Sequence, residues 1–194
     1  VAVNPSFLGI AGFPGRANLV AAVLILLCLS ASWLALRPTW IVSDWMGWRQ
    51  ADTQQMALNA ARPDAAFNIP RINWGGAQPA PVEAEFQLYQ ELVAVLLRWT
   101  GPQESPGQLL SLLFVAVTAW AVYGWLLERF GAWPALLGLA AFLANRNVLF
   151  LATSVQPDAL GLMSFVLALW SFDRWTRTRQ SGLWWCWVIL TAVA

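Results

Sequence analysis

Long apolar stretches are the feature that most limits the fold of this chain. Four stretches of about 20 mostly apolar residues cover residues 17–36, 107–127, 132–153 and 157–175. An α-helix of about that length crosses a bilayer, whose hydrocarbon layer is about 30 Å thick. A fifth apolar stretch, residues 183–194, is too short to cross unless more chain follows. We therefore expect four membrane spans and an incomplete fifth one, in the N-terminal part of a longer protein.

The overall composition also favours a membrane protein. Apolar residues make up 59% of the chain and charged residues only 11%, whereas a soluble domain has about 25% charged residues. The shortage of charge is concentrated in the apolar stretches. The sequence therefore predicts an all-α fold, a polytopic membrane helix bundle in contact with membrane lipid.

The residue types exclude several functions. The chain has no His, which removes the usual base of a nucleophilic triad and the usual axial ligand of haem. All basic residues are Arg and the net charge is only +1, so we expect no binding of nucleic acid. Cys28 and Cys186 lie in apolar stretches, where thiols usually serve packing, so no disulfide is expected. A divalent metal is left open, because acidic residues suit both a hard cation and a metal-free base.

Arginines in the short connections indicate how the spans are oriented. Arg and Lys collect on the cytoplasmic side of a membrane. Arginines precede the first span and follow the second and the fourth: Arg16, Arg129, Arg174, Arg177 and Arg179. We therefore expect a cytoplasmic N-terminus in a bacterial inner membrane. The segment 37–106 and the short turn 154–158 then share the outer face.

The segment 37–106 holds most of the acidic residues. Seven of the ten carboxylates lie in it: Asp44, Asp52, Asp64, Glu83, Glu85, Glu91 and Glu104. Residues 44–61 lack Pro and have Trp and Met at helical spacing, which predicts a helix lying along the membrane surface. Trp48, Asp52 and Gln55 share one face of this helix.

The rest of this segment divides into two parts. Residues 63–81 are rich in Pro, Gly and Asn and are expected to be irregular. In residues 82–98 the apolar side chains follow the helical period, which predicts a second surface helix. Glu83 and Glu85 are expected in its first turns, where the helix dipole favours acids.

Two interpretations of these polar residues remain open. In the simpler one the tryptophans and arginines form the usual belt at the membrane surface, the acids are only solvated, and Asp158 caps the fourth span. In the other, Asp158 and the acids of the outer segment form a functional cluster, because an acid at the start of a membrane helix needs a physical reason.

Three sequence blocks in this order carry a family resemblance. They are WRQADT (residues 48–53), PRINWGG (70–76) with AEFQLYQELVAVL (84–96), and VQPDAL (155–160). The chain thereby resembles the C-type (GT-C) integral-membrane glycosyltransferases, especially the bacterial relatives of dolichyl-phosphate-mannose protein mannosyltransferase and lipid A aminoarabinose transferase. Members of this family take a sugar from a polyprenyl-phosphate carrier and pass it to an acceptor on the outer face of the membrane.

The resemblance implies roles for particular carboxylates. Asp52 matches the acid of the first outer loop and would be the general base toward the acceptor hydroxyl. Glu85 matches the acid that opens the second surface helix and would orient the acceptor or contact a metal. Asp158 would complete the acidic cluster. We expect these three carboxylates to gather in one pocket at the lipid–water boundary.

The leaving lipid phosphate needs positive charge, and guanidinium groups suit phosphate oxygens. Arg49, Arg71 and Arg146 are the candidates. Arg146 interrupts the third apolar stretch and must face the bundle or water, where it would hold a phosphate or pair with Asp158.

The chain also departs from the family pattern. Many relatives have His shortly before the WRQ triplet, where this chain has Met46 and Gly47, and they have Pro where Gln87 and Gln90 stand. Relatives are also much longer. These departures favour an alternative function, a truncated and non-catalytic accessory or structural subunit that packs its tryptophan-rich helices in a larger membrane protein complex. A transporter or channel is less favoured, because nothing indicates a repeated or broken-helix core.

Overall fold

The computed structural model describes residues 14–36, 46–76, 78–83 and 86–194. Within these ranges the fold is all-α, a membrane helix bundle as predicted, with one two-stranded antiparallel sheet. The helices are α1 (Pro14–Leu36), α2 (Gly47–Ala60), α3 (Leu88–Thr100), α4 (Ser105–Phe130), α5 (Ala132–Leu143), α6 (Arg146–Thr153), α7 (Asp158–Thr178) and α8 (Ser181–Val193). The strands are β1 (Arg71–Ile72) and β2 (Ala80–Pro81).

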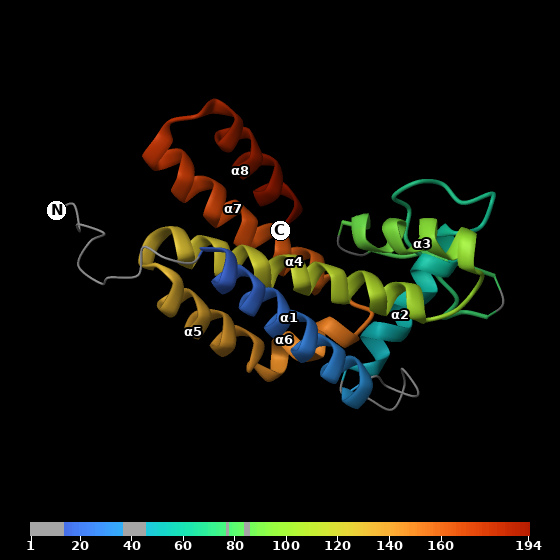
Figure 1. The fold of residues 1–194 in the computed structure, drawn as a ribbon. Helices are drawn as coiled ribbons and strands as arrows, with labels where there is room; N and C mark the ends of the chain where they lie inside the picture. Colours follow the sequence, from blue (N-terminus) through green and yellow to red (C-terminus); the bar gives the residue numbers. More distant parts are fainter. Residues whose placement is uncertain (1–13, 37–45, 77, 84–85) are drawn as a thin grey trace.

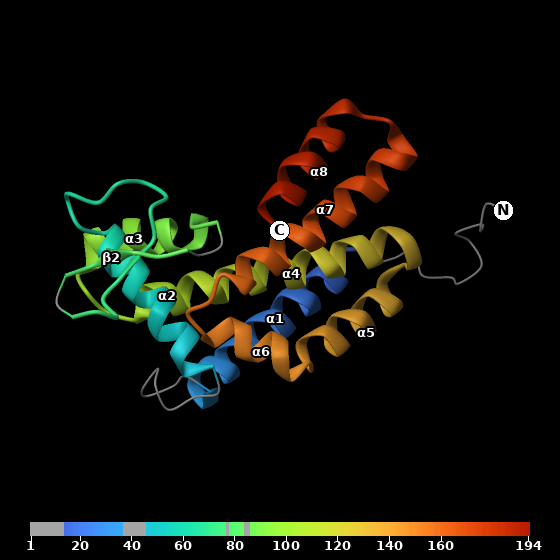
Figure 2. The ribbon, with the colours of Figure 1, turned by 180° about the vertical axis from the view of Figure 1, so that it is seen from behind.

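Helix α4 is the centre of the bundle. It contacts α1, α5 and α6 on one side and α7 on the other, and its first turns meet α3 (Figure 1). Its packing faces are made of small or β-branched residues such as Val115 and Ala119, both fully buried. Small side chains let membrane helices approach closely. Helix α8 packs back on α7 as a hairpin that stands away from the α1–α5–α6 side (Figures 1 and 2).

Side-chain contacts fix the directions of the long helices. The Tyr123 hydroxyl near the end of α4 donates to Asn18 Oδ1 at the start of α1, at 3.0 Å, so α1 and α4 are antiparallel. The Trp125 indole donates to Asp173 Oδ2 at 3.0 Å, so the last turns of α4 and α7 are neighbours and these helices are parallel. The bundle therefore has two distinct ends. We call the end with α2, α3 and the start of α7 the site end, and the opposite end the arginine end.

The arginine end carries a network of ion pairs between α4 and α7. Arg177 lies 2.8 Å from Asp173 Oδ2 and 3.1 Å from Glu128 Oε2. Arg129 pairs with Asp173, and Arg174 lies 3.7 Å from Glu128 Oε1. The arginines that the sequence places on the cytoplasmic side thus lie at one end of the bundle. Exposed pairs of this kind stabilise a fold little, so their main effect is to fix how α4 and α7 align.

The third apolar stretch is not one straight helix. It forms α5 and α6, which are bent by 65° at the break between them. Asn145 lies at the break in an extended conformation, and its Oδ1 accepts a hydrogen bond from Asn147 N at 2.9 Å. A side chain that caps a new helix in this way ends the preceding one. The expectation of one continuous span over 132–153 therefore needs correction.

Two of the described helices are long and apolar enough to cross a membrane. They are α1, over Gly15–Leu34, and α4, and the bent pair α5–α6 is a third candidate if it counts as one span. Helix α7 covers the fourth predicted span but is less apolar, because Asp173, Arg174 and Arg177 lie in its last turns.

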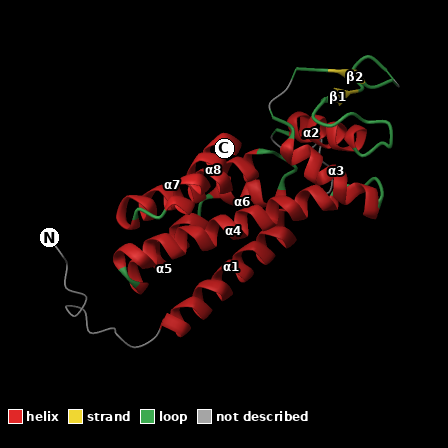
Figure 3. Cartoon of the chain, turned by 90° about the horizontal axis from the view of Figure 1, so that it is seen from above, coloured by secondary structure: helices red, strands yellow, loops and turns green. Residues whose placement is uncertain are grey.

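The first surface helix agrees with the sequence pattern, but the second begins later than expected. Helix α2 lies within the predicted range 44–61, of which residues 44–45 are outside the described residues. Helix α3 begins at Leu88 instead of residue 82. The reason is the pairing of β1 with β2, which Val82 extends by donating its N–H to Pro70 O at 3.0 Å. A helix therefore cannot begin at Val82, directly after the β1–β2 pair that Figure 3 shows.

This late start changes which acid opens α3. Glu83 precedes the helix, so its expected place in the first turns was wrong, and Glu91 is the acid of the first turn. Glu85 lies outside the described residues. Part of the segment 63–81, expected to be irregular, is ordered by the β1–β2 pair.

Gly107 gives a test of the packing at the site end. An added Cβ at Gly107 would lie 2.8 Å from Val155 Cγ1 and 3.2 Å from Val155 Cγ2, and Val155 is fully buried. We predict that Gly107→Ala lowers the free energy of unfolding by about 1–3 kcal/mol, the usual cost of overpacking. Thermal unfolding of the detergent-solubilised protein measures this change.

Gly182→Ala is the matched control. Gly182 also lies near the start of a helix, and a Cβ there would meet no atom within 4 Å. The control should therefore be neutral, or more stable by up to about 1 kcal/mol because Ala favours helix. Equal stability of the two variants would contradict the tight contact between Gly107 and Val155.

Candidate functional site

An ion pair at the site end joins α2 to the start of α7. Arg49 Nη2 lies 3.2 Å from Asp158 Oδ2, and the two side chains are 32% and 41% exposed. A pair this exposed contributes little to stability. Its main consequence is geometric, because it holds a guanidinium and a carboxylate together at one point.

The pair lies on the wall of a hollow of about 380 Å³. Four elements form this wall: α2 gives Arg49, α3 and the residues before it give Phe86 and Tyr89, and α7 and α8 give Leu160 and Val193 among others. The volume is in the range of small-molecule sites, which are mostly apolar with a few placed polar groups. The hollow fits that description.

Asp158 presents an oxygen with unused hydrogen-bonding capacity. Its Oδ2 atom is buried and accepts no hydrogen bond within the described residues, although Arg49 lies close to it. A buried carboxylate oxygen normally accepts hydrogen bonds. The Asp158 side chain as a whole is 41% exposed and lines the hollow, so a ligand there can reach the carboxylate group without displacing Arg49 from Oδ2.

Asp52 lies near this pair but does not line the hollow. It follows Arg49 by three residues on α2, so the two lie about one helical turn apart. Its Oδ1 accepts a hydrogen bond from the Trp74 indole N–H at 3.2 Å. Trp74 is 73% exposed, so this contact lies at the surface, beside the loop that carries β1.

Of the other predicted site residues, Arg71 and Arg146 do not line the hollow. Glu85 is outside the described residues. Arg71 is half-buried in β1, and its Nε is buried with no hydrogen-bond partner within the described residues. Arg146 is the exposed first residue of α6. The expected alternative of an Arg146–Asp158 pair is not observed, because Arg49 pairs with Asp158 instead.

A buried polar cluster underlies the hollow. The Tyr89 hydroxyl donates to Gly107 O at 3.0 Å and shares a hydrogen bond of 2.8 Å with Ser111 Oγ. Gln50 Oε1 accepts a hydrogen bond from Val155 N at 3.1 Å. All five residues of this cluster are buried.

The sequence analysis did not single out this cluster. Two of its members, Gln50 and Val155, lie inside the WRQADT and VQPDAL blocks that were quoted for their neighbouring charges. An uncharged amide next to a charged residue gives a weak signal. That this amide is buried follows only from how the helices pack against one another.

A model of a known protein family matches the C-terminal part of the chain. The family model for dolichyl-phosphate-mannose-protein mannosyltransferase matches residues 88–194, more than half of the chain. The chain belongs to the dolichyl-phosphate-mannose-protein mannosyltransferase family. This confirms the resemblance to GT-C membrane glycosyltransferases. No curated protein and no solved structure matches the chain.

Membership of this mannosyltransferase family establishes a multi-pass membrane protein of a glycosyltransferase family, for which a lipid-linked sugar donor is implied. The matched residues run from the start of α3 to the end of the chain, so they include Tyr89 and Asp158. Arg49 and Asp52 precede the matched region. Their link to the site therefore comes from the contacts of α2 with α3 and with Asp158.

The described residues of this family member contain no group of three acidic or thiol side chains placed to hold a metal ion. Asp158 and Asp52 are the two described members of the predicted acidic cluster, and only Asp158 lines the hollow.

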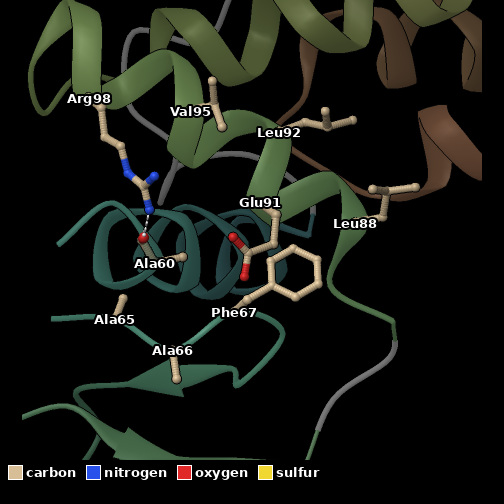
Figure 4. Close-up of a pocket in the computed structure, with 9 residues that line it drawn as sticks. All are labelled: Ala60, Ala65, Ala66, Phe67, Leu88, Glu91, Leu92, Val95 and Arg98. Atoms are coloured by element: carbon tan, nitrogen blue, oxygen red, sulfur yellow. Dashed lines mark hydrogen bonds between the residues drawn. The ribbon is translucent and has the colours of Figure 1, made fainter. Parts of the chain in front are cut away.

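A second hollow, of about 330 Å³, lies on the other side of Leu88. It is formed by the end of α2, one face of α3 and residues 65–67, and its lining is mostly apolar (Figure 4). Glu91 lies beside Phe67 in it, and Glu91 Oε1 accepts a hydrogen bond from Asn68 N at 2.8 Å. Arg98 donates to Ala60 O at 2.9 Å. These contacts join α3 to the end of α2.

The buried Tyr89 hydroxyl gives a test of the polar cluster. Burial raises the pKa of Tyr89 above its ordinary value, and the hydrogen bonds with Ser111 and the Gln156 backbone offset only part of this rise. Tyr89→Phe should lower the free energy of unfolding by about 1–3 kcal/mol, because it leaves the buried Ser111 hydroxyl and Gly107 carbonyl without their partner.

The raised pKa also predicts a pH dependence. The unfolded tyrosine loses its proton at about pH 10, while the folded one keeps it. The free energy of unfolding should therefore fall as the pH rises above about 10, and Tyr89→Phe should make this fall less steep. Chemical denaturation from pH 8 to 11 measures both effects. An equally steep fall in the variant would contradict the assignment to Tyr89.

Proposed function

We propose that this chain is part of a glycosyltransferase that moves a sugar from a polyprenyl-phosphate carrier to an acceptor on the outer face of a bacterial inner membrane. The observation that carries the proposal is the Arg49–Asp158 pair on the wall of the hollow at the site end. A guanidinium suits the phosphate of the donor, and a carboxylate suits the proton of the acceptor.

The two groups supply the two kinds of charge that a displacement at the anomeric carbon needs. The acceptor hydroxyl gives its proton to a carboxylate while its oxygen forms a bond to that carbon. The bond between the carbon and the phosphate oxygen breaks, and the polyprenyl phosphate leaves with an added negative charge. Positive charge placed at that oxygen lowers the barrier. Arg49 is the described arginine that lines the hollow.

The geometry favours Asp158 as the acid that takes the proton. The family resemblance gives this role to Asp52, but Asp52 is engaged with Trp74 outside the hollow. Asp158 lines the hollow, and its side chain is 41% exposed. A hydroxyl bound in the hollow meets Asp158 first, and Asp52 acts from one helical turn away, on the acceptor side.

The walls of the hollow suit a lipid-linked donor. Leu160 of α7 and Val193 of α8 give it an apolar side. A polyprenyl chain is apolar and its phosphate is charged, so the donor needs both surfaces next to each other. With the arginine end in the cytoplasm, the site end faces the outer side and the N-terminus is cytoplasmic.

Replacement of the two charged residues on the wall of the hollow tests this proposal. We predict that Asp158→Asn lowers sugar transfer at least about 100-fold, because a general base contributes about 10²–10⁴-fold to a rate. Arg49→Lys should lower transfer less, because Lys keeps the charge but loses the planar fork that fits phosphate. The full chain is reconstituted in liposomes with mannosyl-phospho-polyprenol, and transfer to an envelope extract is counted.

Asp64→Asn is the control, since Asp64 is 71% exposed and pairs only with Arg62 among the described residues. It should leave transfer unchanged. Asp52→Asn separates the two candidate bases: a loss as large as that of Asp158→Asn supports the role implied by the resemblance, and a small loss supports Asp158. Full transfer by the Asp158→Asn and Asp52→Asn variants together would overturn the catalytic proposal.

One observation favours the accessory subunit as a second candidate function. Helix α8 has no buried residues, and Trp185 and Ile189 on it are each 62% exposed. Such a face is available to lipid or to another membrane helix. If the chain is an accessory subunit, cells that carry the Asp158→Asn protein will glycosylate their envelope normally, while cells that lack the protein will not.

A further inference from the structure

The turn that carries Asp158 is buried although it has no regular secondary structure. Residues 154–157 join α6 to α7, and Ser154, Val155 and Gln156 are each at most 2% exposed. Backbone N–H groups in such a segment need a partner, because an unpaired buried group is costly. The position of Asp158 therefore depends on what bonds this turn.

Gln50 supplies that bond from another part of the chain. Its Oε1 accepts the hydrogen bond of Val155 N at 3.1 Å, and Gln50 is fully buried. Arg49, the preceding residue of α2, pairs with Asp158. Helix α2 thus holds the turn at two points that are three residues apart in the sequence, once through the backbone and once through the carboxylate.

Contacts with α3 and α4 also hold the turn in place, but they do not involve Asp158. The Val155 side chain lies against Gly107 of α4, and the backbone of Gln156 bonds the Tyr89 hydroxyl. These contacts fix where the turn lies. The bond from Gln50 sets the direction of the Val155 peptide unit, next to the Gln156 unit that Tyr89 bonds, so the two together fix the rotation of the turn ahead of Asp158.

The two ends of the Gln50 amide contribute differently. Gln50 Nε2 is buried with no hydrogen-bond partner within the described residues, and an unsatisfied buried donor destabilises a fold. An apolar side chain of the same length would avoid this cost, but it would leave the buried Val155 N–H without its acceptor. The amide oxygen is therefore the useful part of Gln50.

We propose that Gln50 is a positioning residue of the sugar-transfer site, which fixes the 154–157 turn so that Asp158 stays paired with Arg49 on the wall of the hollow. This inference rests on the proposed function. It assigns Gln50 no contact with the donor or the acceptor. Its effect on the reaction passes through the placement of Asp158.

Gln50→Met removes the acceptor oxygen and keeps the length of the side chain. We expect kcat to fall about 100-fold, the usual effect of a misplacement of about 1 Å in a reacting group. The KM for mannosyl-phospho-polyprenol should change little, because Arg49 remains. The matched control is Gln54→Met, one turn further along α2, whose buried amide donates to Gln103 O at 2.9 Å, in the α3–α4 connection. It should leave kcat nearly unchanged.

A double variant separates positioning from a general loss of structure. If Gln50 acts through Asp158, Gln50→Met will have almost no further effect in the Asp158→Asn background, because coupled residues are not additive. Losses that multiply in the double variant, or an equal loss in Gln54→Met, would overturn the proposal. Unchanged kcat in Gln50→Met would overturn it as well.

Hydrogen exchange tests the bond without any activity measurement. In the solubilised full chain, the peptide that contains Val155 should exchange its amide protons at least tenfold faster in Gln50→Met than in the natural sequence, and Gln54→Met should not change it. Unchanged exchange in Gln50→Met overturns the inference. Faster exchange together with a natural chain that transfers no sugar overturns the proposed function instead, and leaves Gln50 with a structural bond only.

Discussion

The packing of the 154–157 turn between α2 and α4 is the contact on which the site end depends. The turn leaves the helical ladder between α6 and α7, so its polar groups must find partners elsewhere. Gln50 accepts the Val155 N–H, and Gly107 leaves space for the Val155 side chain. Without this contact, α2 would touch the bundle mainly through α3, and Arg49 would have no fixed relation to α7.

This contact also explains how a surface helix becomes part of a membrane site. Helix α2 is polar over much of its length, and its buried face contains Gln50, Thr53, Gln54 and Asn59. Two of the hydrogen bonds that place it, from Val155 N and to Gln103 O, each join an amide side chain to the backbone of a connection between helices. The family match begins at α3, yet the charge opposite Asp158 comes from α2.

The sequence predicted those features that depend on local periodicity. The apolar stretches predicted α1 and α4, and the helical spacing of Trp and Met predicted α2. The break at Asn145 and the late start of α3 were not predicted, because each depends on one hydrogen bond, from Asn147 N or from Val82 N. The pairing of Asp158 with Arg49 instead of Arg146 depends on tertiary packing, which no spacing within a single helix can reveal.

The two acids of α7 show why the site end, and not the arginine end, suits a ligand. Asp173 accepts hydrogen bonds from Trp125, Arg129 and Arg177, so both of its oxygens are engaged. Asp158 faces one arginine, and its Oδ2 accepts no hydrogen bond within the described residues. A carboxylate whose oxygens are already engaged joins helices and does little else. A carboxylate that pairs with one arginine and is partly exposed to a hollow can accept a proton or a hydrogen bond from a hydroxyl, and in this chain its direction is set by the residue pair Arg49 and Gln50.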